Sequence, residues 1–128
     1  MLFLKTGIVM LGHGSRAAVG EANDIIMEIA QKVKENLQQD IFEVAFMNTK
    51  SNRQNLAGAI DKVVEQGAQK VVIAPLFITN GMHIRYDIPE EIEEAKKKYE
   101  QVEFVFSRYI GADPVLAQLM VDRIKEVL

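Results

Sequence analysis

The chain has 128 residues, of which 48% are hydrophobic and 26% are charged, and its formal net charge at pH 7 is -3. This size and composition are typical of one globular domain, so we expect residues 1–128 to fold as a single domain. The acidic charge argues against nonspecific nucleic-acid binding. Because the chain contains no cysteine, a disulfide framework and a thiolate metal site are excluded.

The chain has no apolar run near the ~20 residues that cross a bilayer. Its first residues do not resemble a signal peptide, because the apolar stretch Met1–Leu4 is short and Lys5 follows it rather than preceding it. We therefore expect a cytoplasmic protein without a membrane partner.

Four apolar runs rich in β-branched residues alternate with four segments of helical periodicity. The runs span residues 7–12, 42–47, 71–78 and 102–106. Apolar residues recur at helical spacing over 19–37 and 56–64, which predicts the first two helices.

The last two helices are predicted from their start signals. Asp87 is expected to cap the third helix, because Pro89 suits a first turn and Glu90 completes a capping box. Asp113 and Pro114 form a similar start for a fourth helix, which is rich in apolar residues to the end of the chain.

Strand–helix alternation with short connections implies an α/β fold with a doubly wound, four-stranded parallel sheet whose helices cover both faces. We expect the spatial strand order 2-1-3-4. Strands one and three then lie side by side, with their following helices on opposite faces. Ligands bind in the crevice where the winding of such a sheet reverses.

Both histidines of the chain follow these two central strands. His13 lies between two glycines in the turn after the first run, and His83 follows Asn80-Gly81-Met82 after the third. The topology therefore predicts that His13 and His83 meet at one crevice. Neutral imidazole binds metals and titrates near neutral pH, so such a pair is a candidate divalent-metal site, proton acceptor, or both.

Basic residues follow every predicted strand, although the chain is acidic overall. Such a rim favours an anionic ligand, because arginine side chains bind carboxylates and phosphates in a forked geometry, although ordinary surface charge is an alternative. The residues are Arg16, Lys50, Arg53, Arg85 and Arg108.

Two other motifs are less well supported. Residues 12–17 fit the dinucleotide pattern G-x-G-x-x-G/A, but Asn48-Thr49-Lys50 stands where a ribose-binding acid is expected. Ser15 does not lie in the G-x-S-x-G elbow of a hydrolase. It is more consistent with a helix cap or a donor to an anionic ligand.

Three blocks of the chain resemble the short form of the sirohydrochlorin chelatases. The first block is residues 11–16 and the third is residues 110–114. The second block, residues 75–89, contains Pro75-Leu76-Phe77-Ile78, Gly81-Met82-His83 and Asp87-Ile88-Pro89. The resemblance spans essentially the whole chain and implies a chelatase-like fold. It also implies insertion of cobalt, nickel or iron into the tetrapyrrole sirohydrochlorin, a lyase reaction of porphyrin and cobalamin biosynthesis.

The same resemblance implies roles for individual residues. His13 and His83 match the family's metal-binding and catalytic histidines, and His83 is the better candidate for metal contact and proton acceptance. The divalent metal is a substrate, so no permanent cofactor is expected. The implied substrate contacts are Ser15, Arg16, Asn48, Arg53, Gly81, Met82 and Arg85.

The resemblance further implies a homodimer, because longer relatives contain two such domains with the active site between them. A macrocycle is also poorly enclosed by one small domain. One position departs from the family pattern: Asn48 occurs where many relatives have a glutamate. A non-catalytic tetrapyrrole-binding or metal-binding relative is therefore the alternative, and a nucleotide-binding flavodoxin-like module comes third.

Overall fold

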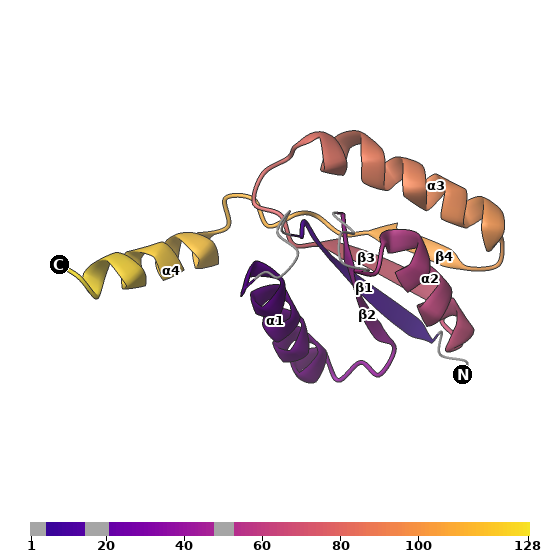
Figure 1. Ribbon diagram of the computed structural model, residues 1–128, viewed down its shortest axis with the longest axis horizontal. Coiled ribbons are helices and arrows are strands. Elements are labelled where there is room, and N and C mark those ends of the chain that lie inside the picture. The colour runs from indigo at the N-terminus through magenta and orange to yellow at the C-terminus, as the bar shows by residue number, and fades with distance from the viewer. Residues whose placement is uncertain (1–4, 15–20, 48–52) are drawn as a thin grey trace.

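The computed structural model describes residues 5–14, 21–47 and 53–128, with side chains omitted at residues 21–23. The described strands form one parallel sheet in the order β2-β1-β3-β4, which confirms the predicted doubly wound topology. Figure 1 shows the sheet between α1 on one side and α2 with α3 on the other. The strands are β1 (Thr6–Gly12), β2 (Phe42–Phe46), β3 (Lys70–Pro75) and β4 (Glu103–Phe106).

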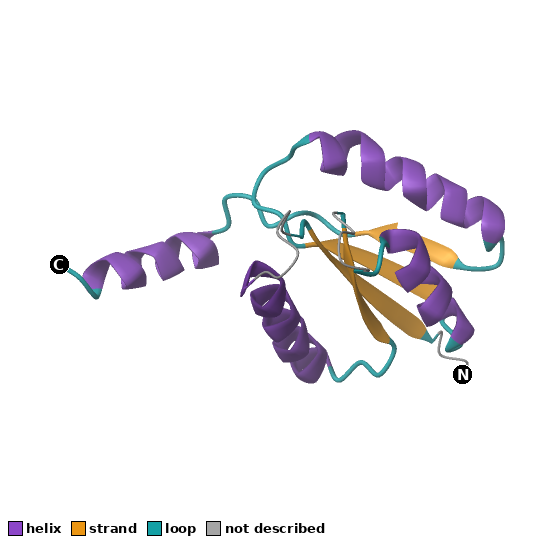
Figure 2. Cartoon of the chain, in the orientation of Figure 1, coloured by secondary structure: helices purple, strands orange, loops and turns teal. Residues whose placement is uncertain are grey.

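The helices alternate with the strands, as Figure 2 shows. A π-helical turn, η2 (His83–Asp87), leads directly into α3. The α-helices are α1 (Glu21–Leu37), α2 (Leu56–Glu65), α3 (Ile88–Lys98) and α4 (Pro114–Lys125). No helix within the described ranges is long and apolar enough to cross a bilayer.

The two faces of the sheet carry separate apolar clusters, because successive strand side chains point to opposite faces. Val9, Leu11, Val71 and Ile73 are buried against α2 and α3. Ile8 and Met10 face the other way, toward Ala30 of α1. The helices that follow β1 and β3 thus lie on opposite faces, and the ends of β1 and β3 adjoin at the reversal point.

The third helix begins differently from the prediction. Asp87 has helical backbone angles and its side chain makes no capping hydrogen bond, so the predicted cap is wrong. The chain already enters a helical turn at His83, because the π-turn precedes α3 without a break. The Asp87 carboxylate accepts a hydrogen bond from His83 instead.

The fourth helix begins as predicted, but it does not pack on the sheet of its own chain. Asp113 caps α4 by accepting a 2.9 Å hydrogen bond from the Val115 backbone N–H. Figure 1 shows α4 extending away from the body, and none of its residues is buried. In this chain the expectation that helices wrap the sheet therefore holds for α1, α2 and α3 only.

Candidate active site

The structure brings the two histidines together at the carboxyl edge of the sheet. His13 follows β1, and His83 is the first residue of η2 after β3. Their ring centroids are 5.2 Å apart with an interplanar angle of 69°. Phe77 packs beside both rings, with centroid distances of 6.0 Å to His13 and 6.3 Å to His83. The three rings form one aromatic cluster at the crevice predicted from topology.

The turn that carries His13 depends on its glycines. Gly14 has a φ of +85°, in the left-handed region that side chains disfavour. At Gly12, an added Cβ would lie 3.0 Å from Cδ1 of Ile26, so a side chain there would crowd the Ile26 side chain of α1 and require it to shift. The glycines thus allow β1 to turn sharply beneath α1 and leave His13 exposed above the strand end.

His83 is held by the carboxylate of Asp87, one π-turn later. The His83 Nδ1 atom lies 2.8 Å from Oδ2 of Asp87, and both side chains are partly exposed. A carboxylate accepts hydrogen bonds, so Nδ1 is the protonated nitrogen of a neutral His83 ring. The lone pair is then on Nε2, which is the usual arrangement of a metal-binding or basic histidine with a carboxylate partner.

A longer hydrogen bond of the same kind orients the His13 ring. Its Nδ1 atom lies 3.3 Å from the carbonyl oxygen of Gly14, which can only accept. This contact also assigns the proton to Nδ1 and the lone pair to Nε2. Each ring therefore carries an unprotonated Nε2, and the rings are close enough, with centroids 5.2 Å apart, to suit a shared divalent cation or the removal of protons from a ligand.

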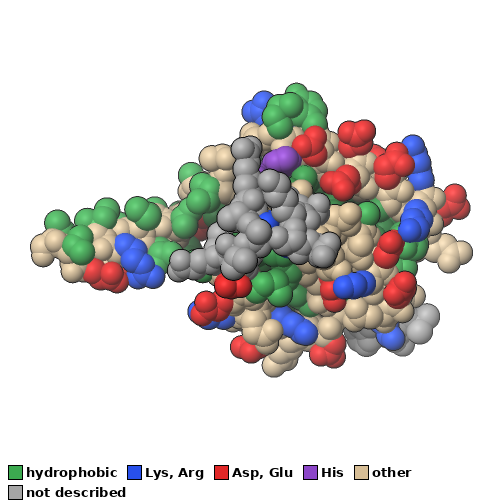
Figure 3. Space-filling model, viewed as in Figure 1, with side chains coloured by type: hydrophobic (Ala, Val, Ile, Leu, Met, Phe, Trp, Pro, Cys, Tyr) green, Lys and Arg blue, Asp and Glu red, His purple; other side chains and the backbone are tan. Residues whose placement is uncertain are grey.

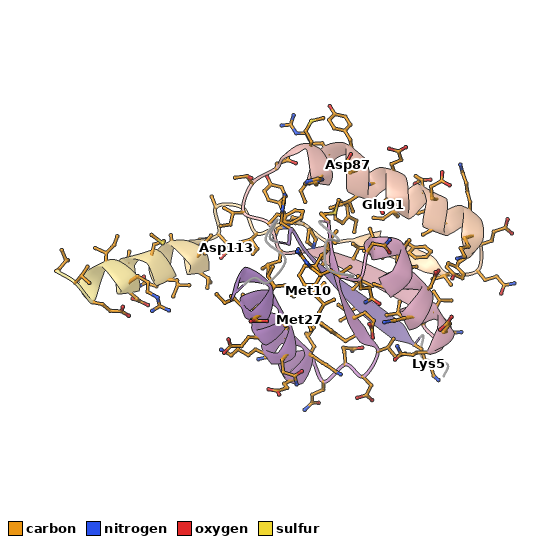
Figure 4. All side chains as sticks on the ribbon, in the orientation of Figure 1. Lys5, Met10, Met27, Asp87, Glu91 and Asp113 are labelled. Carbon is orange, nitrogen blue, oxygen red and sulfur yellow. The ribbon has the colours of Figure 1, made fainter. Side chains whose placement is uncertain are left out.

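Glu91, in the first turn of α3 after His83, is an acidic group with a raised pKa. Burial raises the pKa of Glu91, and the neighbouring carboxylates of Asp87 and Glu90 raise it further, while His83 acts in the opposite direction. Figure 4 shows Asp87 and Glu91 at the start of α3. The carboxyl groups of Asp87, Glu90 and Glu91 therefore lie on the His83 side of the pair. The His13 ring instead contacts the backbone carbonyl of Gly14.

No cluster of three or more His, Asp or Glu side chains suited to a metal ion occurs in the part of the chain that the structure describes. The two histidines therefore form an open, two-nitrogen site. Ser15, Arg16, Asn48 and Lys50 were predicted to belong to this edge, but they lie outside the described residues.

The other residues predicted to contact a ligand differ in their exposure and in their position around the two histidines. Met82 is 67% exposed, and a Cβ added at Gly81 would meet no atom within 4 Å, so both leave open space beside His83. Arg85 is exposed on η2. Arg53 is partly buried between β2 and α2, and Arg108 is exposed after β4. In Figure 3 the histidine surface lies next to hydrophobic side chains near the top of the view.

A cavity of about 1480 Å³ adjoins this edge. Asn80 and Ile84, on either side of His83 in the sequence, line it, whereas the two imidazoles lie outside its walls. The opposite walls are the segment 106–114 and one face of α4. Arg108 and Tyr109 belong to these walls and supply a cation and a phenol. The space is large enough for a sizeable organic ligand, since drug-sized pockets measure roughly 300–1,000 Å³.

Comparison with known proteins assigns the family. The sequence matches the CbiX family profile over residues 7–127. It is 30% identical to the sirohydrochlorin cobaltochelatase of Methanothermobacter thermautotrophicus, over 97% of this chain and 94% of that protein. The chain belongs to the CbiX family.

Longer members of the family match only in part. The chain is 33% identical to the sirohydrochlorin ferrochelatase of Priestia megaterium, covering 93% of this chain but 43% of that protein. The crystal structure of the sirohydrochlorin chelatase SirB from Bacillus subtilis subspecies spizizenii, in complex with cobalt, superposes with a TM-score of 0.88 at 26% identity. That match covers 97% of this chain and 51% of SirB. This CbiX chain thus spans about half of these two proteins and nearly all of the cobaltochelatase.

Sequence reasoning predicted that the two histidines meet, but it did not predict two residues that contact them. Asp87 was interpreted as a helix cap, although its spacing of four residues from His83 would have allowed a pair on one helical face. Phe77 was included only as part of the third apolar run and of the resemblance, and no pattern in the sequence predicted its contact with both imidazoles.

Proposed function

We propose that this CbiX chain inserts a divalent metal ion, cobalt, nickel or iron, into sirohydrochlorin. The main support is the meeting of His13 and His83, 5.2 Å apart, with both Nε2 atoms left free by the hydrogen bonds at Nδ1. Relatives named sirohydrochlorin cobaltochelatase and ferrochelatase support the same substrate. The metal is a substrate in this proposal, and no permanent cofactor takes part.

Metallation requires two pyrrolic protons to leave the macrocycle and a hydrated ion to exchange water for ring nitrogens. Nε2 of His83 contacts the metal first and, after the ion has moved to the macrocycle nitrogens, its freed lone pair accepts one pyrrolic proton, because Asp87 stabilises the imidazolium that forms. The second pyrrolic proton passes in the same way to the freed Nε2 of His13. His13 supplies the second nitrogen ligand during delivery. Two ligands hold an ion weakly, which suits transfer to a tetrapyrrole that offers four nitrogens.

The carboxylates on the rim of sirohydrochlorin provide the second part of recognition. Arg85 and Arg108 are exposed beside the histidine cluster and the cavity, and they attract these anions. Arg53 and the Gly81–Met82 backbone are further contacts in this proposal, together with Ser15, Arg16 and Asn48. The metal preference follows from ligand geometry and from which ion is supplied.

The functional unit in this proposal is a cytoplasmic homodimer of single-domain chains. Its support is the length relation within the family: this chain matches half of some relatives and nearly all of another. Two copies of the chain would then provide the equivalent of one long relative. The carboxyl edges would face each other and enclose the macrocycle between them.

The test is metallation of sirohydrochlorin by the purified chain, followed by absorption spectroscopy with cobalt, nickel and iron in parallel. We expect insertion faster than in a protein-free control for at least one ion, and no such acceleration by the His13→Ala/His83→Ala double variant. A rate equal to the protein-free control for all three ions would contradict the proposal. Binding of the macrocycle without turnover would favour the non-catalytic relative.

A further inference from the structure

Phe77 lies at the candidate site although its side chain can neither bind a metal nor move a proton. Its ring centroid is 6.0 Å from that of His13, with an interplanar angle of 61°. It is 6.3 Å from that of His83, with an angle of 41°. Both separations fall within the range of roughly 4.5–7 Å found for aromatic rings in contact. A residue of this kind acts through the groups that it contacts.

The hydrogen bonds at Nδ1 leave each imidazole some freedom to move. The His13 side chain is exposed, and its contact with the Gly14 carbonyl is long, at 3.3 Å. His83 has a closer partner in Asp87, but that carboxylate is 49% exposed. One hydrogen bond at a ring nitrogen fixes which nitrogen carries the proton, whereas the ring can still swing about that bond. Neither hydrogen bond sets the separation between the two histidines.

The backbone around Phe77 is held by both strands that neighbour β3. The N–H of Leu76 donates to the Leu11 carbonyl at 2.8 Å, and the Phe77 carbonyl accepts from the N–H of Ile110 at 2.8 Å. Leu11 belongs to β1, which leads directly to His13, and Ile110 follows β4. Position 77 is therefore fixed relative to the strand end that carries His13.

The Phe77 side chain also packs on the apolar core. It is partly buried against the cluster of residues between the sheet and the layer of α2 and α3. Ile84, the residue after His83, packs on the same cluster. A side chain that rests on a close-packed core has little freedom to change its rotamer. The core therefore restrains the Phe77 ring, and the ring limits the motion of the two imidazoles that it contacts.

The separation of the imidazoles matches the one that a shared metal ion requires. Bonds of about 2.1 Å to one nitrogen of each ring, at a roughly tetrahedral angle, place two imidazole centroids roughly 5 Å apart. The observed separation between His13 and His83 is 5.2 Å. Because each of the three rings contacts the other two, neither imidazole can move away from the other without also moving against Phe77.

We propose that Phe77 is a positioning residue that holds His13 and His83 at the separation at which both bind one divalent ion. The proposal rests on the proposed function of the histidine pair, and it adds a residue that sets how tightly the pair binds metal. Two ligands on separate segments bind an ion more tightly when their separation is set beforehand, because binding then orders fewer groups. Phe77 itself makes no bond to the ion.

The first test compares two substitutions of phenylalanine by leucine. Phe77→Leu keeps an apolar side chain over the core but removes the flat ring beside the imidazoles. Phe104→Leu is the matched control, because Phe104 is also partly buried against the same cluster. It pairs with Val71 near the start of β3, away from the carboxyl edge of the sheet. Both variants should lower the urea midpoint by similar amounts, so a difference between them in metal binding does not reflect stability.

Cobalt binding is measured without the macrocycle, from the absorption of the bound ion. Phe77→Leu should raise the cobalt dissociation constant by about 5- to 100-fold, the effect of losing two aromatic contacts. Phe104→Leu should leave the constant unchanged. Equal constants in the wild type and Phe77→Leu would overturn the proposal. An equal rise in both leucine variants would also overturn it, because core packing in general would then set the affinity.

The second readout is the proton NMR spectrum of the two imidazole rings, which a purely structural role would not change. The ring current of Phe77 displaces imidazole signals of both histidines. This displacement should vanish in Phe77→Leu and persist in Phe77→Tyr, which keeps the ring and should bind cobalt nearly as tightly as the wild type. If Phe77→Tyr retains the displacement but binds cobalt as weakly as Phe77→Leu, the ring contact does not set the affinity and the proposal fails.

Metallation kinetics separate this proposal from the proposed function. Phe77→Leu should raise the apparent KM for cobalt and leave the KM for sirohydrochlorin unchanged, since Phe77 acts through the histidines. A rise in the KM for sirohydrochlorin alone would make Phe77 a contact of the macrocycle and overturn the positioning role. If the wild type fails to metallate sirohydrochlorin while Phe77→Leu still weakens cobalt binding, the chelatase proposal fails and the positioning role stands.

Discussion

The layer of α2 and α3 and the carboxyl edge of the sheet differ in nearly every property. In the layer, Leu56, Ile60, Val63 and Ile88 are at most 2% exposed. At the edge, Met82 is 67% exposed, and His13 is also exposed. Side chains in the layer are held by many neighbours, whereas those at the edge are held by a few directional contacts. Stability and chemistry therefore reside in separate regions, and substitutions should affect one or the other.

The largest expected effect is at the edge. His83→Ala should lower the rate of metal insertion by about 10²–10⁴-fold, the usual contribution of a positioned acid–base group. The urea midpoint should change little, because His83 is a turn residue outside the buried core. Single-turnover metallation and urea unfolding on the same preparation measure both effects. A variant with full insertion activity would remove His83 from the proposed mechanism.

The layer should show the opposite behaviour. Ile60→Ala removes a side chain that is 2% exposed and packed beneath β1 and β3, so we expect a loss of about 2–5 kcal/mol of unfolding free energy. The folded fraction should keep its metallation rate when the assay is run well below the melting temperature. If the rate per folded molecule falls as far as in His83→Ala, the two regions are not separable.

A smaller effect at the edge is expected from a substitution of Asp87, whose carboxylate accepts the hydrogen bond from His83. Asp87→Asn keeps the size and an acceptor oxygen but loses the charge that stabilises an imidazolium, so insertion should slow by roughly 10–100-fold. Glu94→Gln, on an exposed position of the same helix, is the matched control. An insertion rate equal to that of the Glu94→Gln control would mean that the Asp87 charge takes no part in the reaction.

The smallest effect concerns a polar contact between α2 and α3. The Tyr99 hydroxyl donates to Oδ1 of Asp61, and this bond, with a further contribution from Lys98, holds the pKa of Asp61 below its usual value. Because the folded-state pKa is depressed, the stabilisation is present above the unfolded pKa and is lost as pH falls through the folded pKa.

Tyr99→Phe should therefore cost about 0.5–1 kcal/mol near pH 7, a modest figure because Asp61 is partly exposed. The difference from wild type should shrink in acid, as urea unfolding between pH 7 and pH 3 would show. Metallation should not change. An equal difference at every pH would assign the effect to packing of the ring instead.

Much of the fold could be predicted from the sequence, because strand and helix periods alternate without interruption. The order of strands and the meeting of His13 and His83 follow from topology alone. The position of α4 could not be predicted, since an apolar helix has the same pattern whether it packs on its own sheet or on another chain. Asp87 was misassigned because a cap signal and a histidine partner share the same sequence position.

The central claim is that the two imidazoles offer their Nε2 atoms to one metal ion. Nitrogen-15 NMR of histidine-labelled protein tests it directly, because the chain has only two histidines and each ring gives its own signals. Without metal, both neutral rings should show the Nδ1–H tautomer, and added cobalt should shift or broaden both Nε2 signals at the same metal concentration. Signals that respond for one ring only, or for neither, would contradict the account.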